Sequence, residues 1–217
     1  MHLVVFDVDG TLVDSSEING RLYREAVETE LGIKVDDDWS RYRHVTDSGI
    51  LNEIMGEADG TRDRPLAYAR IKKAFVQTVA DHIGARRGRM PEIVGARAFV
   101  ERLRSRPGVS VAVATGGWRE TAEMKLRAIG LDPAELCMAS CSDAMSRVGI
   151  MRIAEEKALG GGRAARRTYF GDRPWDLRAS QELGYGFVAI GGGVVWPACY
   201  PDFSDAEAIL GELGLDP

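Results

Sequence analysis

Two aspartates on alternate positions, Asp7 and Asp9, follow a short apolar run and precede a Gly-Thr pair. The apolar run 3–6 contains adjacent valines and is typical of a buried strand. Alternate residues of a strand point to the same face, so both carboxylates leave the carboxyl end of this strand side by side. Two like charges that close repel by roughly 4 kcal/mol at an effective dielectric constant near 20. The pair therefore indicates a cation between the carboxylates or a proton on one of them.

A second acidic pair, Asp172 and Asp176, follows the apolar run 168–170. Asp172 would leave the tip of that strand, and Asp176, one helical turn later, would lie on the same side. Both residues could instead serve only to favour a helix N-terminus. With Asp7 and Asp9 already placed, we interpret the four aspartates as ligands of Mg²⁺, which prefers oxygen donors.

A hydroxyl followed by glycines closes another candidate strand, at Thr115-Gly116-Gly117. The Thr115 hydroxyl and the backbone N–H of Gly116 suit a phosphate oxygen, and the helix that follows adds the positive end of its dipole. An ordinary helix cap is the alternative interpretation of this turn. Together with the acidic pairs, the turn predicts a site for a phosphorylated ligand.

These segments resemble the motifs of the haloacid dehalogenase superfamily, in the class with a helical C1 cap and phosphoglycolate phosphatase-like members. Asp7-Val8-Asp9-Gly10-Thr11 resembles the first motif, Asp-x-Asp-Gly-Thr, and Thr115 resembles the second, a Ser or Thr that closes a strand. Gly171-Asp172-Arg173-Pro174-Trp175-Asp176 resembles the fourth motif, Gly-Asp-x-x-x-Asp. The motifs occur in the order of the family and span the whole chain.

The third motif of the family supplies a Lys, sometimes an Arg, upstream of the Gly-Asp motif. Arg147 opens a helix at about the right distance from Asp172 and is our candidate for this cation. A guanidinium is a fixed positive charge and can bind two oxygens at once. Lys125 and Lys157 lie in the middle of predicted helices, and we expect both to face solvent.

The resemblance implies hydrolysis of a phosphate monoester through an aspartyl-phosphate on Asp7. Asp9 would begin protonated, donate to the leaving alcohol and then accept a proton from the attacking water. Mg²⁺ would bind Asp7, the main-chain carbonyl of Asp9 and Asp172, with Asp176 orienting Asp172 or a metal-bound water. Thr115, Gly116 and Arg147 would hold the oxygens of the transferred group.

Strands and helices alternate from residue 91 onward, which predicts a Rossmann-like, doubly wound parallel α/β sheet with helices on both faces. In such sheets ligands bind beyond the carboxyl ends of the strands, where every motif falls. The predicted core elements are a strand at 3–6, a helix at 93–104, a strand at 109–114, a helix at 119–129, a strand at 136–140, a helix at 147–159, a strand at 168–170, a helix at 174–183 and a strand at 186–190.

Residues 15–90 contain no convincing strand and show apolar residues at helical spacing. Expected helices cover 15–31, 47–55 and 64–83. We predict a smaller all-helical cap domain over 15–90, inserted after the first strand of a core domain formed by 1–14 and 91–217. The polar loop 43–49 precedes a cap helix, and Thr46 and Asp47 could contact the leaving group or merely cap that helix.

Composition limits the classes of partner. The chain has 217 residues and a net charge of −5 with both signs interspersed, which argues against nucleic acid. No apolar run approaches the ~20 residues of a membrane helix, and the first strand leaves no room for a signal peptide. Three cysteines in mostly apolar surroundings fit a reduced cytoplasmic protein. The expected partner is a small phosphorylated metabolite, and the oligomeric state stays open.

Several functions share these residues. Because dehalogenases and phosphonate-cleaving members of the family lack the second aspartate, Asp9 favours a phosphatase or a phosphomutase of the β-phosphoglucomutase type. We predict a phosphatase, the commoner activity of this architecture. A receiver-type phospho-acceptor domain fits less well, since its acceptor does not lie on the first strand. A catalytically silent binding protein would not need the intact set of Asp7, Asp9, Thr115 and Asp172.

Overall fold

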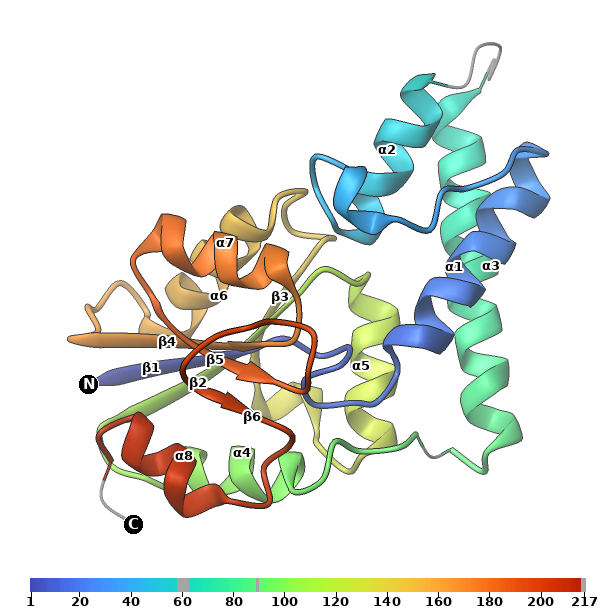
Figure 1. The fold of residues 1–217 in the computed structure, drawn as a ribbon. Coiled ribbons are helices and arrows are strands. Elements are labelled where there is room, and N and C mark those ends of the chain that lie inside the picture. The colour runs from blue at the N-terminus through green and yellow to red at the C-terminus, as the bar shows by residue number, and fades with distance from the viewer. Residues whose placement is uncertain (58–62, 89, 216–217) are drawn as a thin grey trace.

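The structure, a computed structural model, describes residues 1–57, 63–88 and 90–215. A six-stranded sheet with parallel neighbours lies at its centre, in the order β3-β2-β1-β4-β5-β6 (Figure 1). This arrangement confirms the predicted doubly wound α/β fold. The strands are β1 (His2–Phe6), β2 (Val109–Thr115), β3 (Cys137–Ser140), β4 (Arg166–Gly171), β5 (Gly186–Ile190) and β6 (Cys199–Tyr200).

The middle strand β1 is buried at every residue, as a strand covered on both faces must be. Phe6 pairs in register with Val113 of β2 and with Phe170 of β4, so the three strands end within two residues of one another. The next residue, Asp7, donates its backbone N–H to the carbonyl of Phe170 at 2.9 Å. Residues that follow β1, β2 and β4 therefore meet at one edge of the sheet.

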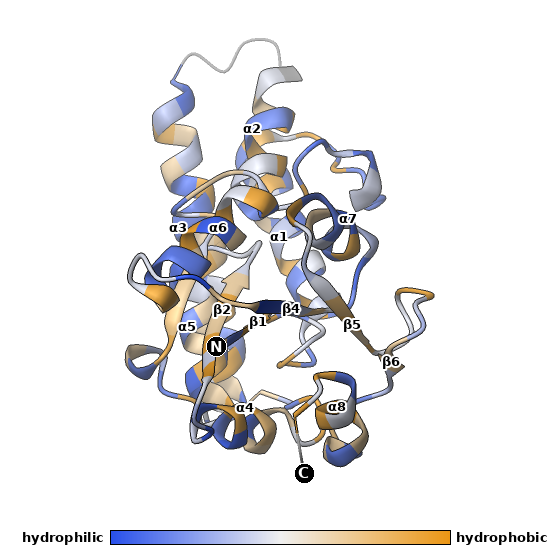
Figure 2. Cartoon of the chain, turned by 90° about the vertical axis from the view of Figure 1, so that its left-hand side faces the viewer, coloured by the Kyte–Doolittle hydropathy of each residue, from blue (hydrophilic) through white to orange (hydrophobic). Residues whose placement is uncertain are grey.

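Helices cover both faces of the sheet: α6 and α7 lie on one side and α4 and α8 on the other (Figure 1). Apolar and hydrophilic bands alternate along these helices in Figure 2, as is typical of amphipathic helices that pack on a sheet. Their bounds are α4 (Ala96–Arg104), α5 (Arg119–Ala128), α6 (Arg147–Leu159), α7 (Pro174–Leu183) and α8 (Ala206–Glu212).

One predicted helix start was wrong. We expected this helix to begin at residue 93, whereas α4 begins at Ala96. Gly95 precedes it with φ +78°, and a Cβ there would lie 3.0 Å from the carbonyl oxygen of Phe203. The left-handed backbone and the close approach of the chain both require glycine and delay the helix.

Three helices stand beside the sheet, in the upper right of Figure 1: α1 (Ser16–Leu31), α2 (Asp47–Glu57) and α3 (Arg64–Ala85). A short 3-10 helix, Trp39–Arg41, precedes α2. The buried residues of α3, at successive four-residue steps, are Ile71, Phe75, Val79 and Ile83. The described part of 15–90 contains no strand, as predicted.

An aromatic cluster joins these helices to the sheet side of the molecule. Trp118, 1% exposed, precedes α5. Its ring centroid lies 5.6 Å from that of Phe75 and 5.9 Å from that of Tyr23. The indole N–H donates to the hydroxyl of Tyr68 at 3.2 Å, so the polar atom of this buried ring is satisfied.

The chain passes between sheet and helices at two adjacent points. Asp14 donates its backbone N–H to the carbonyl of Pro91 at 2.9 Å, and Val13 forms an antiparallel bridge with Glu92. The segment that leaves the sheet at residues 13–14 and the segment that returns to it at residues 91–92 are therefore held together. None of the helices described is long and apolar enough to cross a bilayer.

Candidate active site

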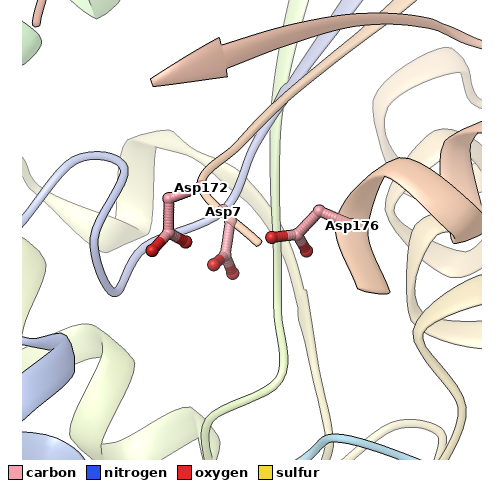
Figure 3. A group of neighbouring side chains, drawn as sticks. All are labelled: Asp7, Asp172 and Asp176. Atoms are coloured by element: carbon pink, nitrogen blue, oxygen red, sulfur yellow. The ribbon is translucent and has the colours of Figure 1, made fainter. Parts of the chain in front are cut away.

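Three carboxylates from separate parts of the chain meet beyond the strand ends (Figure 3). Asp7 follows β1, Asp172 follows β4, and Asp176 lies in the first turn of α7. One carboxylate oxygen of each lies within 4.8 Å of the others. All three residues are buried, with exposures of 3%, 6% and 0%. The fold thus brings together three of the four aspartates that we predicted as metal ligands.

Burial and mutual repulsion raise the pKa values of this cluster. Burial, followed by the charges of Asp176 and Asp7, raises the pKa of Asp172 to about 8. Burial also raises the pKa of Asp7 to about 7, although the neighbouring guanidinium of Arg147 acts to lower it. Negative charge here is poorly compensated by the protein alone, which is the condition under which a carboxylate cluster gains most from a cation.

Arg147 begins α6 and extends its guanidinium into the cluster. Its Nη1 lies 3.2 Å from Oδ1 of Asp7 and 3.0 Å from Oδ1 of Asp176. The second contact is an ion pair without hydrogen-bond alignment. Its Nη2 donates to the carbonyl of Val45 at 3.3 Å. The structure therefore places our third-motif candidate beside the proposed nucleophile.

The donor set fits a hard divalent ion. Oδ1 of Asp172 is buried and has no hydrogen-bond partner among the described residues, while its Oδ2 pairs with Nε of Arg173 at 2.8 Å. Oδ2 of Asp176 is occupied by the backbone N–H of Arg173 at 3.1 Å. An orphaned carboxylate oxygen in an all-oxygen cluster is what Mg²⁺ coordination would satisfy.

The turn after β1 depends on a glycine. Gly10 has φ +83°, and a Cβ there would lie 2.2 Å from Oδ2 of Asp172. Substitution would therefore both strain the backbone and push into the acidic cluster. The glycine of the first motif thus has a steric role that composition alone does not show.

Asp9 points to different partners. Its Oδ1 accepts hydrogen bonds from the hydroxyl of Ser15 and from Nζ of Lys125, each at 2.5 Å. Nζ of Lys125 also donates to Oδ1 of Asn19 at 2.6 Å. The Asp9 side chain is not part of the metal-type cluster among the described residues.

Our expectation that Lys125 faces solvent was wrong, because the residue is only 1% exposed. It belongs to the inward face of α5, together with Thr121, Ala122 and Leu126. That three- and four-residue spacing is visible in the sequence and could have revealed the buried position. We instead followed the general rule that a lysine in mid-helix is solvated. Lys157, by contrast, keeps a side chain that is 40% exposed.

The glycine turn after β2 lies close to the acidic cluster. The hydroxyl of Thr115 accepts from the backbone N–H of Gly117 at 3.2 Å. A Cβ on Gly116 would lie 2.6 Å from Nη2 of Arg147 and 3.2 Å from the carbonyl oxygen of Val45. Glycine at position 116 therefore leaves the space that the guanidinium occupies.

The loop before α2 packs on this turn. Asp47 donates its backbone N–H to the carbonyl of Gly116 at 2.8 Å, and its Oδ2 accepts from the backbone N–H of Trp118 at 3.0 Å. The Asp47 carboxylate thus accepts from the N-terminal end of α5, although Asp47 itself belongs to α2. Burial raises its pKa to about 7, even though Lys125 acts to lower it. The Thr46 hydroxyl donates to the carbonyl of Met145 at 2.8 Å and accepts from Gly49 N–H at 3.0 Å.

A cavity of about 440 Å³ opens over these groups, a size suited to a small ligand. Its floor comes from the strand ends and its opposite wall from α1 and the segment before α2. The site residues predicted from the sequence that line it are Asp7, Asp9, Thr46, Asp47, Thr115, Gly116, Arg147 and Asp172. The remaining wall includes Arg21, Arg24, Trp39 and Trp175.

A parallel sheet with a carboxylate cluster and a glycine turn at its carboxyl edge is the class of α/β protein that the fold and the site define. The sequence profile of the haloacid dehalogenase-like hydrolases matches residues 4–190. The chain belongs to this family, and our identification from the motifs is confirmed. A search of curated proteins found no match to this sequence.

Solved structures share the fold over nearly the full length. A hydrolase from Pseudomonas syringae superimposes with a TM-score of 0.75 at 20% identity, covering 98% of this chain and 99% of the other. A CbbY variant from Rhodobacter sphaeroides, in complex with xylulose 1,5-bisphosphate, gives 0.73 at 19% identity and covers 99% of both chains. YfnB from Bacillus subtilis, bound to magnesium, gives 0.61 at 15% identity, covering 97% and 98%.

Proposed function

We propose that the protein is a magnesium-dependent phosphatase that hydrolyses a small phosphate monoester through an aspartyl-phosphate on Asp7. The observation that supports this most is the position of Asp7 on the cavity floor, within reach of Asp172, Asp176 and Arg147. A nucleophile there is surrounded by groups that can hold both a cation and an anionic phosphoryl group. Family membership supports a hydrolytic enzyme.

In this proposal Mg²⁺ would be held by Asp7, Asp172 and the main-chain carbonyl of Asp9, with Asp176 nearby. When bound, the ion supplies positive charge that offsets the repulsion between an anionic nucleophile and an anionic substrate. The unpartnered Oδ1 of Asp172 supports this assignment. The magnesium bound to YfnB, a structure of the same fold, is consistent with it.

The residues of the chain would divide the reaction into two displacements. Asp7 attacks phosphorus while Asp9 protonates the oxygen of the leaving alcohol. Asp9 then takes a proton from the water that attacks the aspartyl-phosphate, which restores both carboxyl groups. Thr115, the backbone N–H of Gly116 and Arg147 would hold the phosphoryl oxygens during both steps.

The three-helix unit would act as a cap. We propose that residues 15–90 form this cap and that 1–14 with 91–217 form the core. The hydrogen-bonded crossing at Asp14 and Pro91 and the contact of Asp47 with the Gly116 turn support this division. A cap seated over the cavity can exclude water and contact the leaving group, with Thr46 and Asp47 as our candidates.

A phosphatase assay tests the proposal. Purified protein with Mg²⁺ should release inorganic phosphate from p-nitrophenyl phosphate and from members of a phosphate-ester panel, and EDTA should stop the release. Acid-quenched reactions with ³²P-labelled substrate should leave a hydroxylamine-sensitive label on the wild type and none on Asp7→Asn. Isomerisation of a sugar phosphate without net phosphate release would instead indicate a phosphomutase. Absence of turnover across the panel would contradict both activities.

A further inference from the structure

Lys125 carries a charge into the interior of the protein, and no motif accounts for it. Its side chain is 2% exposed and its Nζ lies 2.5 Å from Oδ1 of Asp9. Burying an ammonium is costly unless hydrogen-bonding partners compensate it. Here the partners are Asp9 and Asn19, 116 and 106 residues away in sequence.

Two donors converge on one oxygen of Asp9. Ser15 stands at the N-cap of α1, yet its side chain makes no capping bond and donates to Oδ1 of Asp9 at 2.5 Å. Lys125 donates to the same oxygen. Short hydrogen bonds to a charged group are the strong ones, so this pair fixes the orientation of the carboxyl group.

The other oxygen of Asp9 faces the phosphate-type turn. Oδ2 lies 3.6 Å from the position that a Cβ on Gly117 would take, and Oγ1 of Thr115 lies at the same distance from that point. Among the described residues, no hydrogen bond reaches Oδ2 of Asp9. The clamp on Oδ1 therefore leaves Oδ2 directed at the place where phosphate oxygens would bind.

We propose that Lys125 is a positioning residue that holds Asp9 by Oδ1, so that Oδ2 is the oxygen that exchanges the catalytic proton. This inference rests on the proposed phosphatase function. In the first step Oδ2–H gives its proton to the bridging oxygen as the P–O bond breaks and the Asp7–phosphorus bond forms. In the second, Oδ2 accepts a proton from water as the water oxygen bonds to phosphorus and the Asp7–phosphorus bond breaks.

The proposal makes the effect of Lys125 depend on the leaving group. An alkoxide is a strong base and needs its proton during bond cleavage, whereas p-nitrophenolate leaves without one. A misaligned Asp9 therefore slows transfer of the phosphoryl group to Asp7, the step that kcat/KM reports, much more for alkyl phosphates than for p-nitrophenyl phosphate. A purely structural role of Lys125 would slow both substrates by the same factor.

Lys125→Met removes the ammonium and keeps an unbranched side chain of similar length. We expect its kcat/KM to fall about 30- to 100-fold for an alkyl phosphate that the wild type hydrolyses, within the range of general acid catalysis. For p-nitrophenyl phosphate we expect kcat/KM to fall less than about threefold, because its first step needs no proton from Asp9. In an Asp9→Asn background, Lys125→Met should add less than about twofold.

Two further variants keep the test decisive. Ser15→Ala removes the second donor to Oδ1. It should lower kcat/KM for the alkyl phosphate relative to kcat/KM for p-nitrophenyl phosphate, as Lys125→Met does, but by a smaller factor. It also tests the clamp if Lys125→Met does not fold. Lys157→Met is the matched control, because Lys157 lies in the last turn of α6 and pairs with Asp143, and neither residue lines the cavity. The ratio of its kcat/KM values for the two substrates should equal that of the wild type.

Equal losses on both substrates for Lys125→Met, or an unchanged ratio for both Lys125→Met and Ser15→Ala, would overturn the inference. A further loss in the Asp9→Asn background as large as in the wild type would also overturn it, since Lys125 would then act independently of Asp9. A wild type without phosphate release from either substrate would instead contradict the proposed function itself.

Discussion

The two aspartates that follow β1 lie only two residues apart but in different electrostatic surroundings. Asp7 shares one guanidinium, that of Arg147, with Asp176, and the third carboxylate of the cluster, Asp172, pairs with Arg173. Asp9 pairs with the ammonium of Lys125, whose charge also acts on Asp47, and accepts from a hydroxyl. The Asp7 side gathers three carboxylates, whereas on the other side two donors hold one oxygen of Asp9. In the proposed function, the first region would receive a cation and a phosphoryl group, and the second would hold the Asp9 carboxyl group in place.

The largest loss of activity should come from a substitution on the Asp7 side. Asp7→Asn removes the nucleophile while preserving shape, and we expect kcat for phosphate release to fall at least about a thousandfold. Phosphate release under saturating Mg²⁺ measures the loss. Near-normal turnover would show that Asp7 is not the nucleophile and would remove the distinction between the two sides.

Arg147→Met should follow, with a loss of kcat of about a hundredfold or more, typical of removing a charged donor to a transferred group. Arg147→Lys should recover part of the activity, because an ammonium keeps the charge but not the fork of donors. Steady-state kinetics on one substrate compare the three proteins. Equal activity of the Met and Lys variants would mean that the guanidinium fills space and contributes no charge.

The third prediction concerns stability without metal. Folding raises the pKa of Asp7 to about 7 and of Asp172 to about 8, well above the usual value of an unfolded aspartate. The unfolded chain therefore releases these protons at lower pH than the folded one. The stabilising contribution of these two protons is complete below about pH 4 and is lost as pH rises to about 8, so stability declines over that range.

Urea unfolding in EDTA at several pH values measures this decline. Asp172→Asn should reduce it, and Mg²⁺ should restore stability at pH 8 by binding the folded state. Lys157→Met, whose residue lies outside the acidic cluster, should leave the decline between pH 5 and 8 unchanged. Stability that rises between pH 5 and 8 in EDTA would contradict the picture of an undercompensated cluster.

The smallest change in kinetics should come from a substitution in the proposed cap, at Asp47. Asp47→Asn can still accept the hydrogen bond from Trp118 and therefore preserves the helix cap. We expect KM for an alkyl phosphate to change by about three- to tenfold, with little change in kcat. Ser48→Ala is the control, since Ser48 bonds to the carbonyl of Cys141 and does not line the cavity. Identical KM values for both variants would exclude Asp47 as a substrate contact.

The acidic cluster was accessible from the sequence because parallel strands end at one edge. Asp7 and Asp172 each follow an apolar run, and Asp176 lies one turn later, so topology alone brings them together. Arg147 needed the family resemblance, because nothing in the local pattern distinguishes it from a solvated arginine. The two-residue strand β6 and the seven-residue helix α8 are too short to show a period, and we predicted neither.

Lys125 illustrates what residue-type rules miss. Its spacing from Thr121 and Ala122 places it on the buried face of α5, but residue type argued for solvent. A buried lysine becomes predictable only when its partner is known, and Asp9 lies 116 residues away in sequence. Periodicity should therefore take precedence over residue type when a lone charge falls on an apolar helical face.

The paired crossing at Val13–Asp14 and Pro91–Glu92 has a consequence for protein engineering and for evolution. The backbone N–H of Asp14 and the carbonyl of Pro91 are 2.9 Å apart, so a linker of a few residues would close the chain if the intervening helices were excised. The sheet and its catalytic edge would keep their connectivity. If these helices act as the proposed cap, such a junction would let a lineage exchange them for another unit by recombination while the residues at the edge of the sheet are inherited intact.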